Sequence, residues 1–286
     1  MLLHCGKFKL DLSHPKVMGI VNVTPDSFSD GGRHLSHAAA IAHARRLIEE
    51  GADMLDIGGE STRPGAAAVS EQEELDRVLP VIEGLRDIAV PISIDTWKPS
   101  VMRAALAAGA SMVNDINALQ APEALAALSG SDAAVCLMHK QGNPESMQLA
   151  PQYADVMDEV MSFLKIRVAA AQAAGIARER IVVDPGFGFG KTLVHNLALL
   201  KNMQVFADLG VPVLAGLSRK SMLGAITGQD VEHRQAASVA AALIAVQRGA
   251  AIVRVHDVRE TVDALKIWNV VNEKSLPQRH RDTEKT

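Results

Sequence analysis

The stretches 180-RIVVDP-185 and 251-AIVRVH-256 show the pattern that decides the fold of this chain. Each is a short β-branched or apolar run that ends abruptly in a polar residue. Strands that are covered on both faces read as such continuous apolar runs. Helix-patterned sequence separates them from six further runs: 17-VMGIVN-22, 53-DMLDIGGE-60, 91-PISIDT-96, 111-SMVND-115, 133-AAVCLMH-139 and 211-VPVLAGLS-218. This strand–helix alternation, repeated over about 250 residues, predicts a single α/β domain, a (β/α)8 TIM barrel.

The polar residues at the ends of these runs predict where the functional site lies. In a (β/α)8 barrel, the active site lies at the C-terminal ends of the strands. We therefore expect one mouth formed by Asn22, Asp95, Asn114, His139, Asp184, Ser218 and His256. Three connections on this side of the barrel are too long for simple turns, which predicts functional loops. They cover residues 23–36, 58–70 and 139–152.

Composition argues against several classes of protein. The net charge is −4 with interspersed signs, so we expect neither nucleic acid nor a membrane surface as a partner. The two cysteines, Cys5 and Cys136, lack metal-ligand spacing, which favours a reduced, cytoplasmic protein. The N-terminus has no signal-peptide pattern, and no apolar run reaches the roughly 18 residues of a membrane span.

Three parts are expected along the chain. Residues 1–16 form an N-terminal extension, as a lid or a short hairpin at the bottom of the barrel. Residues 17–272 form the barrel, and residues 273–286 form a polar C-terminal tail that we expect to fray. Within the barrel, Ser70 and Glu73 predict a capping box at the start of the second helix. Pro99 and Pro122 suit the first turns of the next two helices.

Seven segments together give a more specific indication. They are 20-IVNVTPDSFSDGG-32, 56-DIGGESTRPGA-66, 93-SIDT-96, 113-VNDI-116, 183-VDPGFGFGKT-192, 216-GLSRKSMLG-224 and 252-IVRVHDV-258. In this order they resemble the dihydropteroate synthases, from about residue 17 to residue 271. The resemblance implies a transferase of folate biosynthesis that joins 4-aminobenzoate to 6-hydroxymethyl-7,8-dihydropterin diphosphate. The products would be 7,8-dihydropteroate and diphosphate. It also implies a Mg2+ cofactor, a homodimer and a target of sulfonamides.

The edge of a pterin ring carries donors and acceptors that carboxylates and amides can match. Asp95, Asn114 and Asp184 end three strands and could supply this set. A single Asp could simply cap the following helix, but three at strand ends favour a ligand site. Met138 alone is more typical of a core position. By resemblance, the pterin-binding residues are Asp95, Asn114, Asp184 and Lys220, with Met138 and Phe189 as apolar walls.

A diphosphate requires cationic groups. Arg254 and His256 alternate on the last strand, so they point to the same face. A buried Arg implies either a phosphate site or an internal salt bridge, and its strand end favours phosphate. The amide oxygen of Asn22 suits a single protein ligand for Mg2+, which retains waters and phosphate oxygens. By resemblance, the diphosphate-binding residues are Thr62, Arg63, Arg254 and His256.

For 4-aminobenzoate, the requirements are an anchor for the carboxylate and a flat apolar slot. Ser221 would open a helix whose N-terminal amides favour an anion. Phe28 and Pro64 could clamp the ring from two long loops, and Lys220 would lie between both substrates. The alternative for Ser221 and Lys220 is an ordinary helix cap and a solvated side chain.

The glycine-rich run 186-GFGFGKT-192 resembles the end of a phosphate-binding loop. Pro185 stands where the Walker pattern requires Gly, so ATP binding is disfavoured. We expect a tight turn whose glycines let the pterin lie close to the backbone.

The predicted mechanism is displacement of diphosphate at the pterin methylene. An arylamine is unprotonated at neutral pH, so stabilisation of the departing diphosphate matters more than a strong base. The residues that we expect to act in catalysis are Lys220, Arg254, His256 and Asp95. One alternative is a pterin-binding methyltransferase that acts with a corrinoid protein. Another is a pterin-binding paralogue without turnover.

Overall fold

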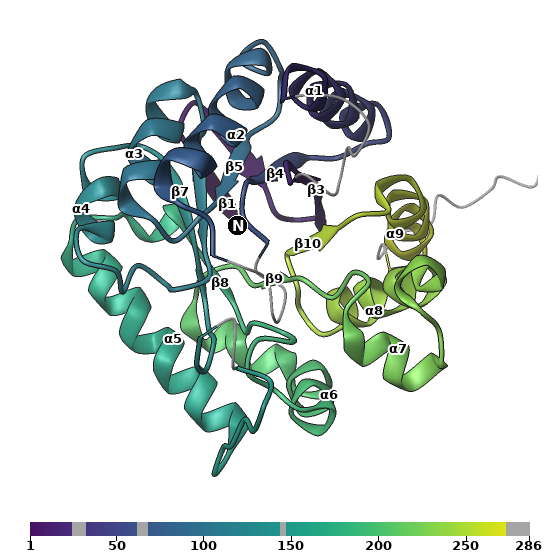
Figure 1. The fold of residues 1–286 in the computed structure, drawn as a ribbon. Helices are drawn as coiled ribbons and strands as arrows, with labels where there is room; N and C mark the ends of the chain where they lie inside the picture. Colours follow the sequence, from purple (N-terminus) through teal and green to yellow (C-terminus); the bar gives the residue numbers. More distant parts are fainter. Residues whose placement is uncertain (25–32, 62–67, 144–146, 273–286) are drawn as a thin grey trace, which may run out of the picture.

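The computed structural model describes residues 1–24, 33–61, 68–143 and 147–272, with the backbone alone for residues 33–36. Eight parallel strands form a nearly closed ring in the order β8-β7-β6-β5-β4-β3-β10-β9 (Figure 1). Each predicted run overlaps one of these strands, which confirms the predicted barrel. The strands are β3 (Lys16–Asn22), β4 (Met54–Gly58), β5 (Ile92–Asp95), β6 (Met112–Asp115), β7 (Ala134–Met138), β8 (Ile181–Asp184), β9 (Leu214–Ala215) and β10 (Ile252–Val255).

The ring closes between β8 and β9, where pairing is shortest. Val183 and Val213 form an isolated parallel bridge, and the Val183 N–H donates to the Pro212 carbonyl at 3.0 Å. Elsewhere the ladders are longer, as between β3 and β4, which pair from Met18–Met54 to Asn22–Gly58. Because all pairs in the ring are parallel, the C-terminal ends of the strands lie on one face.

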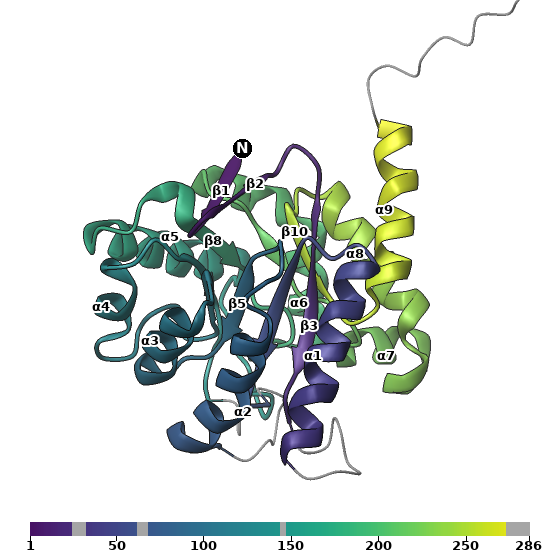
Figure 2. The same cartoon turned by 90° about the horizontal axis from the view of Figure 1, so that it is seen from above.

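Helices cover the outside of the ring (Figures 1 and 2). Two helices, α7 and α8, separate β9 from β10. The helices are α1 (Arg33–Glu49), α2 (Glu71–Gly84), α3 (Pro99–Ala108), α4 (Ala124–Ser129), α5 (Val156–Ala173), α6 (Leu193–Lys201), α7 (Ser221–Thr227), α8 (Gln235–Gln247) and α9 (Val258–Asn272). Short 3-10 helices cover Arg178–Arg180, Met203–Leu209 and Val231–His233.

The helix starts predicted from the sequence are confirmed only in part. The Ser70 side chain caps α2 by accepting from the Glu73 N–H at 3.2 Å, and Pro99 is the first residue of α3. The prediction for Pro122 is wrong, because α4 begins two residues later at Ala124. Glu123 precedes it in a left-handed conformation, with φ of 65°.

Side-chain alternation divides the barrel strands other than β5 between two cores. On β4, Leu55 and Ile57 point outward to the helices, while Met54 belongs to an inner core at the start of the strands. That inner core also contains Met18, Met112, Ala134, Cys136, Val182, Leu214 and Ile252. The next residue of the same alternation on four of these strands is polar: Asp56, Asn114, Asp184 and Arg254. A polar layer therefore lies directly above an apolar one.

A hairpin lies across the end of the barrel where the strands begin (Figure 2). Its strands, β1 (Leu2–Cys5) and β2 (Phe8–Asp11), pair antiparallel, so of the two forms expected the hairpin is present. Leu3 and Cys5 are fully buried and complete the inner core. The Gly6 N–H donates to the Asp132 carbonyl at 2.9 Å and attaches the hairpin to the start of β7.

Truncating Leu3 tests whether this hairpin is part of the core. Leu3→Ala should lower the free energy of unfolding by about 2–5 kcal/mol, because it leaves a cavity in the inner core. Leu2→Ala is the matched control: Leu2 is 50% exposed, and its loss should change the value by less than about 0.5 kcal/mol. Urea denaturation followed by circular dichroism measures both. Equal, small effects would show that the hairpin does not seal the barrel.

Candidate active site

Arg254 lies at the centre of the mouth between two carboxylates from other strands. Its Nε donates to Asp56 Oδ2 at 2.6 Å, and its Nη2 donates to Asp95 Oδ2 at 2.8 Å. Asn114 Nδ2 also donates to Asp56 Oδ2, at 3.0 Å. Burial opposes the charge of Arg254, but the carboxylates of Asp56 and Asp95 outweigh it and raise the pKa of the guanidinium. These contacts connect β10, β4, β5 and β6 across the barrel.

Asp56 is a site residue that sequence reasoning missed. It is fully buried in the middle of β4, whereas the sequence pattern points only to polar residues at strand ends. Its alternation with Met54 could have revealed it, because a carboxylate on the inner face requires a partner. The sequence left open an internal salt bridge as the alternative role of Arg254, and this salt bridge is present. A phosphate contact for Arg254 stays a prediction.

Asp56 and Asp95 each have one carboxylate oxygen to spare. Within the described part of the chain, Oδ1 of each is buried without a hydrogen-bond partner. An unsatisfied buried acceptor costs free energy, so these oxygens suit a ligand that brings donors. Burial raises the pKa of Asp95 to about 7, with Arg254 opposing the shift and Asp56 adding to it.

A second cluster forms around Gly216, which directly follows β9. A methyl group on Gly216 would lie 3.8 Å from Asp184 Oδ2, 3.9 Å from Lys220 Nζ and 4.0 Å from Arg254 Cβ. Burial raises the pKa of Asp184, and the Lys220 charge opposes this. Burial lowers the pKa of Lys220 to about 8. The Asp184 carboxylate and the Lys220 ammonium thus lie next to Gly216, together with the base of the Arg254 side chain.

Apolar groups line the space beside Lys220. The Lys220 ammonium lies 4.7 Å from the centre of the Phe189 ring, in a cation–π contact. Met138 ends β7 and is buried, while Phe189 is half-buried. The structure therefore places these two residues and the predicted polar set on neighbouring strands and loops. A flat ring bounded by polar groups at its edge fits this combination.

The remaining predicted residues occupy different places. Asn22 ends β3 and is half-buried, and Ser221 is the exposed first residue of α7. His256 follows β10, with its Nδ1 3.0 Å from Ser218 Oγ. His139 is buried and faces Lys191 at 2.9 Å. Phe28, Thr62, Arg63 and Pro64 lie outside the described residues.

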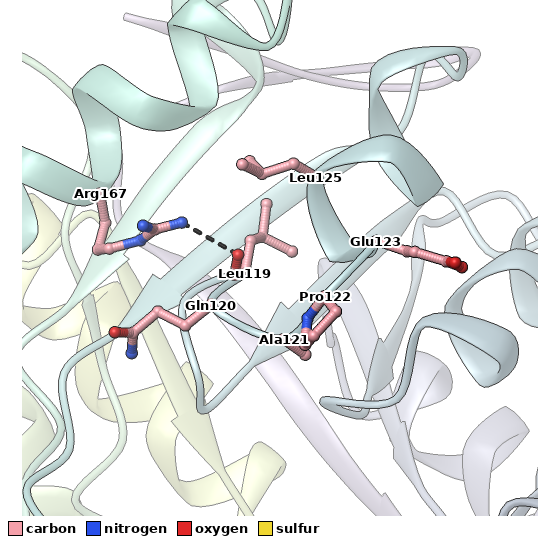
Figure 3. Close-up of a pocket in the computed structure, with 7 residues that line it drawn as sticks. All are labelled: Leu119, Gln120, Ala121, Pro122, Glu123, Leu125 and Arg167. Carbon is pink, nitrogen blue, oxygen red and sulfur yellow. Dashed lines mark hydrogen bonds between the residues drawn. The ribbon is translucent and has the colours of Figure 1, made fainter.

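A pocket of about 430 Å³ lies between the β6–α4 connection and α5 (Figure 3). The Arg167 guanidinium crosses it and donates to the carbonyls of Ala118 at 2.7 Å and Leu119 at 3.0 Å. It is lined by Leu119, Gln120, Ala121, Pro122, Glu123, Leu125 and Arg167. None of these is a predicted site residue, so the pocket is not the candidate active site.

Comparison with known proteins identifies the family. Residues 18–256 match the family described as pterin binding enzyme. The chain is 52% identical to the dihydropteroate synthase of Escherichia coli (strain K12), over 93% of this chain and 95% of the relative. The chain belongs to the dihydropteroate synthase family. Identity to the dihydropteroate synthase of Neisseria meningitidis serogroup C is 53%, over 93% of this chain and 96% of that relative.

Solved dihydropteroate synthases share the fold closely. The Xanthomonas albilineans enzyme with 4-aminobenzoic acid has a TM-score of 0.91 at 56% identity, covering 96% of this chain and 99% of that one. The same enzyme in complex with 7,8-dihydropteroate has a TM-score of 0.87 at 52% identity, covering 97% of this chain and 100% of that one.

Within the described ranges, no helix is long and apolar enough to cross a membrane.

The ion pairs of Arg254 should contribute strongly to stability. Asp56→Ala should lower the free energy of unfolding by about 3–5 kcal/mol, because it leaves Arg254 under-compensated and Asn114 Nδ2 without its acceptor. Asp56→Asn keeps the volume and an acceptor oxygen, so it should cost less. Asp87→Ala is the control, since it breaks an exposed pair with Arg45 that is worth about 0–1 kcal/mol. If urea denaturation gave Asp56→Ala and Asp87→Ala the same loss in the free energy of unfolding, this role of Asp56 would be contradicted.

Proposed function

We propose how this site performs the reaction of its family. The protein is an enzyme that condenses 6-hydroxymethyl-7,8-dihydropterin diphosphate with 4-aminobenzoate, a step of folate biosynthesis. The products are 7,8-dihydropteroate and diphosphate. The observation that carries the assignment of roles is the cluster of Asp184, Lys220 and Arg254 around Gly216. Asp184 and Lys220 supply an acceptor and a donor for the edge of the ring, and the Arg254 side chain beside them carries a cation for the diphosphate.

The pterin lies in the cradle formed by the polar layer of the barrel. Asp184 and the spare oxygen of Asp95 accept from the ring's donors, and Asn114 contributes its amide. Lys220, which lies beside Asp184 next to Gly216, donates to the ring. Met138 and Phe189 form the apolar walls. Matching of buried donors and acceptors explains selectivity, because a wrong ring would leave these groups unpaired.

Arg254 and His256 bind the diphosphate, together with Thr62 and Arg63. A guanidinium has five N–H donors, and the two carboxylates engage only Nε and Nη2 of Arg254. The same side chain can thus keep its ion pairs and still donate to a phosphate oxygen. Ser218 orients the His256 imidazole, which donates a proton to the leaving group.

The aminobenzoate slot is built from Phe28, Pro64, Lys220 and Ser221. Ser221 stands at the first residue of α7, where main-chain N–H groups favour a carboxylate. Lys220 lies between this slot and the pterin. A solved dihydropteroate synthase from Yersinia pestis carries a sulfonamide drug complex. We place sulfonamides in the same slot of this enzyme, because they imitate the shape of 4-aminobenzoate.

Mg2+ fits the mouth as an ion held chiefly by the substrate. Among the described residues, no group of three His, Cys, Asp or Glu side chains could hold a metal. Asn22, at the end of β3, offers one amide oxygen, and Mg2+ often takes one or two protein ligands beside waters and phosphates. When bound, the ion would neutralise charge on the diphosphate.

The chemical step is a displacement at the methylene carbon. The amine nitrogen of 4-aminobenzoate forms the new C–N bond while the C–O bond to diphosphate breaks, and the amine then releases one proton to solvent. Positive charge that develops on the pterin is stabilised by the carboxylates of Asp95 and Asp184. Negative charge on the leaving group is stabilised by Arg63, Arg254 and His256. Preorganised charges of this kind usually contribute more to catalysis than any other single effect.

The enzyme acts as a cytoplasmic homodimer. Both cysteines are free and buried, which suits a reducing compartment. The neighbouring helices α7, α8 and α9 carry exposed apolar side chains, among them Ile226, Ile244 and Val270. Such a group of exposed apolar residues is typical of a surface that associates.

Diphosphate release tests the reaction. Supplied with the pterin diphosphate and Mg2+, the protein should release diphosphate in proportion to added 4-aminobenzoate, with 7,8-dihydropteroate detected by mass spectrometry. Pterin binding without any release would indicate a paralogue without turnover. Methyl transfer to a corrinoid protein would indicate the alternative enzyme.

Two substitutions should separate the ring from the leaving group. His256→Ala should weaken binding of the pterin diphosphate, yet leave binding of 6-hydroxymethyl-7,8-dihydropterin unchanged, because its contact exists only with the phosphates. Asp184→Ala should weaken binding of both ligands alike, by about 2–4 kcal/mol. Isothermal titration calorimetry gives the four affinities. Equal losses for both ligands in His256→Ala would place His256 at the ring instead.

Removal of the Asn22 amide tests the metal site. Asn22→Ala should weaken Mg2+ binding in the presence of pterin diphosphate by about tenfold, which corresponds to about 1.4 kcal/mol. Asn202→Ala, at the end of α6, is the control and should have no effect. Calorimetric titration of Mg2+ into each complex is the measurement. Unchanged affinity in Asn22→Ala would remove Asn22 from the metal site.

A further inference from the structure

The turn 186–190, between β8 and α6, has an unusual set of hydrogen bonds. Each of its five consecutive main-chain carbonyls accepts from a side chain. Lys191 Nζ donates to Gly186 O at 2.9 Å and to Phe189 O at 3.0 Å, Lys220 Nζ to Phe187 O, Gln148 Nε2 to Gly188 O, and Tyr153 Oη to Gly190 O at 2.8 Å.

The backbone conformation explains why side chains are needed. Gly186, Gly188 and Gly190 have φ of 71°, 79° and 62°, so the segment cannot continue a strand or a helix. Its carbonyls therefore lack ladder partners, and buried carbonyls must be satisfied in some other way. The turn is also pressed against the connection after β7. A methyl group on Gly186 would lie 1.8 Å from His139 O, and one on Gly190 would lie 2.2 Å from Gln141 O.

Lys191 joins the two connections. Its side chain is buried, and its ammonium lies 3.3 Å from His139 O and 2.9 Å from His139 Nδ1, besides the carbonyls of Gly186 and Phe189. Among the described residues, it meets only these carbonyls and the imidazole. Burial lowers the pKa of Lys191 to about 7, and Asp184 opposes this shift. The charge is thus held chiefly by main-chain dipoles.

We propose that Lys191 is a positioning residue, whose ammonium fixes the turn 186–190 against the connection after β7 and thereby places Phe189 and Lys220 for the pterin. The inference rests on the proposed function, because it takes these two residues as pterin contacts. The link is direct: Phe187 O in the turn binds the Lys220 ammonium, and the Phe189 ring lies 4.7 Å from it.

Two other roles for Lys191 agree less well with the geometry. As a proton donor to substrate it would have to face the mouth, but its ammonium is surrounded by protein carbonyls. As a packing residue it would be a poor choice, because burying an ammonium without a carboxylate is costly. A methionine would fill the same space without that cost. Within the turn, Gly186 O also accepts from the Phe189 N–H at 3.2 Å. The charge is explained if its purpose is to hold carbonyls that no strand ladder or helix satisfies.

Lys191→Met is the principal test, since it retains the volume and removes the donors. The Kd for 6-hydroxymethyl-7,8-dihydropterin should rise at least tenfold. KM for the pterin diphosphate should rise more than kcat falls. Arg180→Met is the matched control, because Arg180 also caps carbonyls, of Ala133 at 2.8 Å and Leu128 at 3.5 Å, at the other end of β7. It should lower the melting temperature and leave the pterin Kd unchanged.

Two further measurements keep the test open if Lys191→Met does not fold. Tyr153→Phe removes one carbonyl contact from the same turn and should raise the pterin Kd about threefold, or about 0.65 kcal/mol. Lys191→Ala should regain pterin binding with added propylammonium but not with propanol. That difference would show that the cation is required, rather than the filled space.

The outcomes separate this inference from the proposed function. If the wild-type protein binds no pterin, both are overturned. If the wild type binds pterin, an unchanged Kd in Lys191→Met overturns this inference alone. So does an equal loss in Arg180→Met, or equal rescue by propanol, because either result would reduce Lys191 to a general stabilising role.

Discussion

A guanidinium held between two carboxylates at the centre of the barrel is the interaction on which the site depends. Arg254 would be too costly to bury alone, and so would Asp56. Together with Asp95 and Asn114 they form one polar layer that spans four strands. Among the residues that the structure describes, two buried carboxylate oxygens of this layer have no hydrogen-bond partner. The fold thus meets the cost of burying charge while retaining acceptors for a ligand.

The strands and the face of the site could be predicted because both follow from local rules. Burial on both sides makes each strand an apolar run, and the parallel arrangement brings all polar endings to one face. Asp56 could not be found in this way. It pairs with Arg254 across 198 positions, so its role is visible only once the ring has closed. The prediction for Pro122 failed for a local reason. Glu123 adopts a left-handed conformation, so α4 begins at Ala124 and not at Pro122.

The same limit applies to the glycine-rich turn. Sequence indicates that 186-GFGFGKT-192 is tight, but not which groups will satisfy its carbonyls. These come from the connection after β7, from Lys220 just before α7, and from Lys191 itself. Burial lowers the pKa of both lysines that hold the turn. The Lys191 ammonium is held by main-chain oxygens, while the Lys220 ammonium also lies near Asp184 at the mouth.

The closed end of the barrel, where the strands begin, determines how ligands enter and leave the enzyme. The inner core fills the barrel below the polar layer, and Leu3 and Cys5 cover its lower end. Substrates, diphosphate and product therefore enter and leave on the face that carries the polar layer. Under the proposed roles, the pterin sits deepest, against the polar layer. Those roles imply that the pterin diphosphate enters before 4-aminobenzoate.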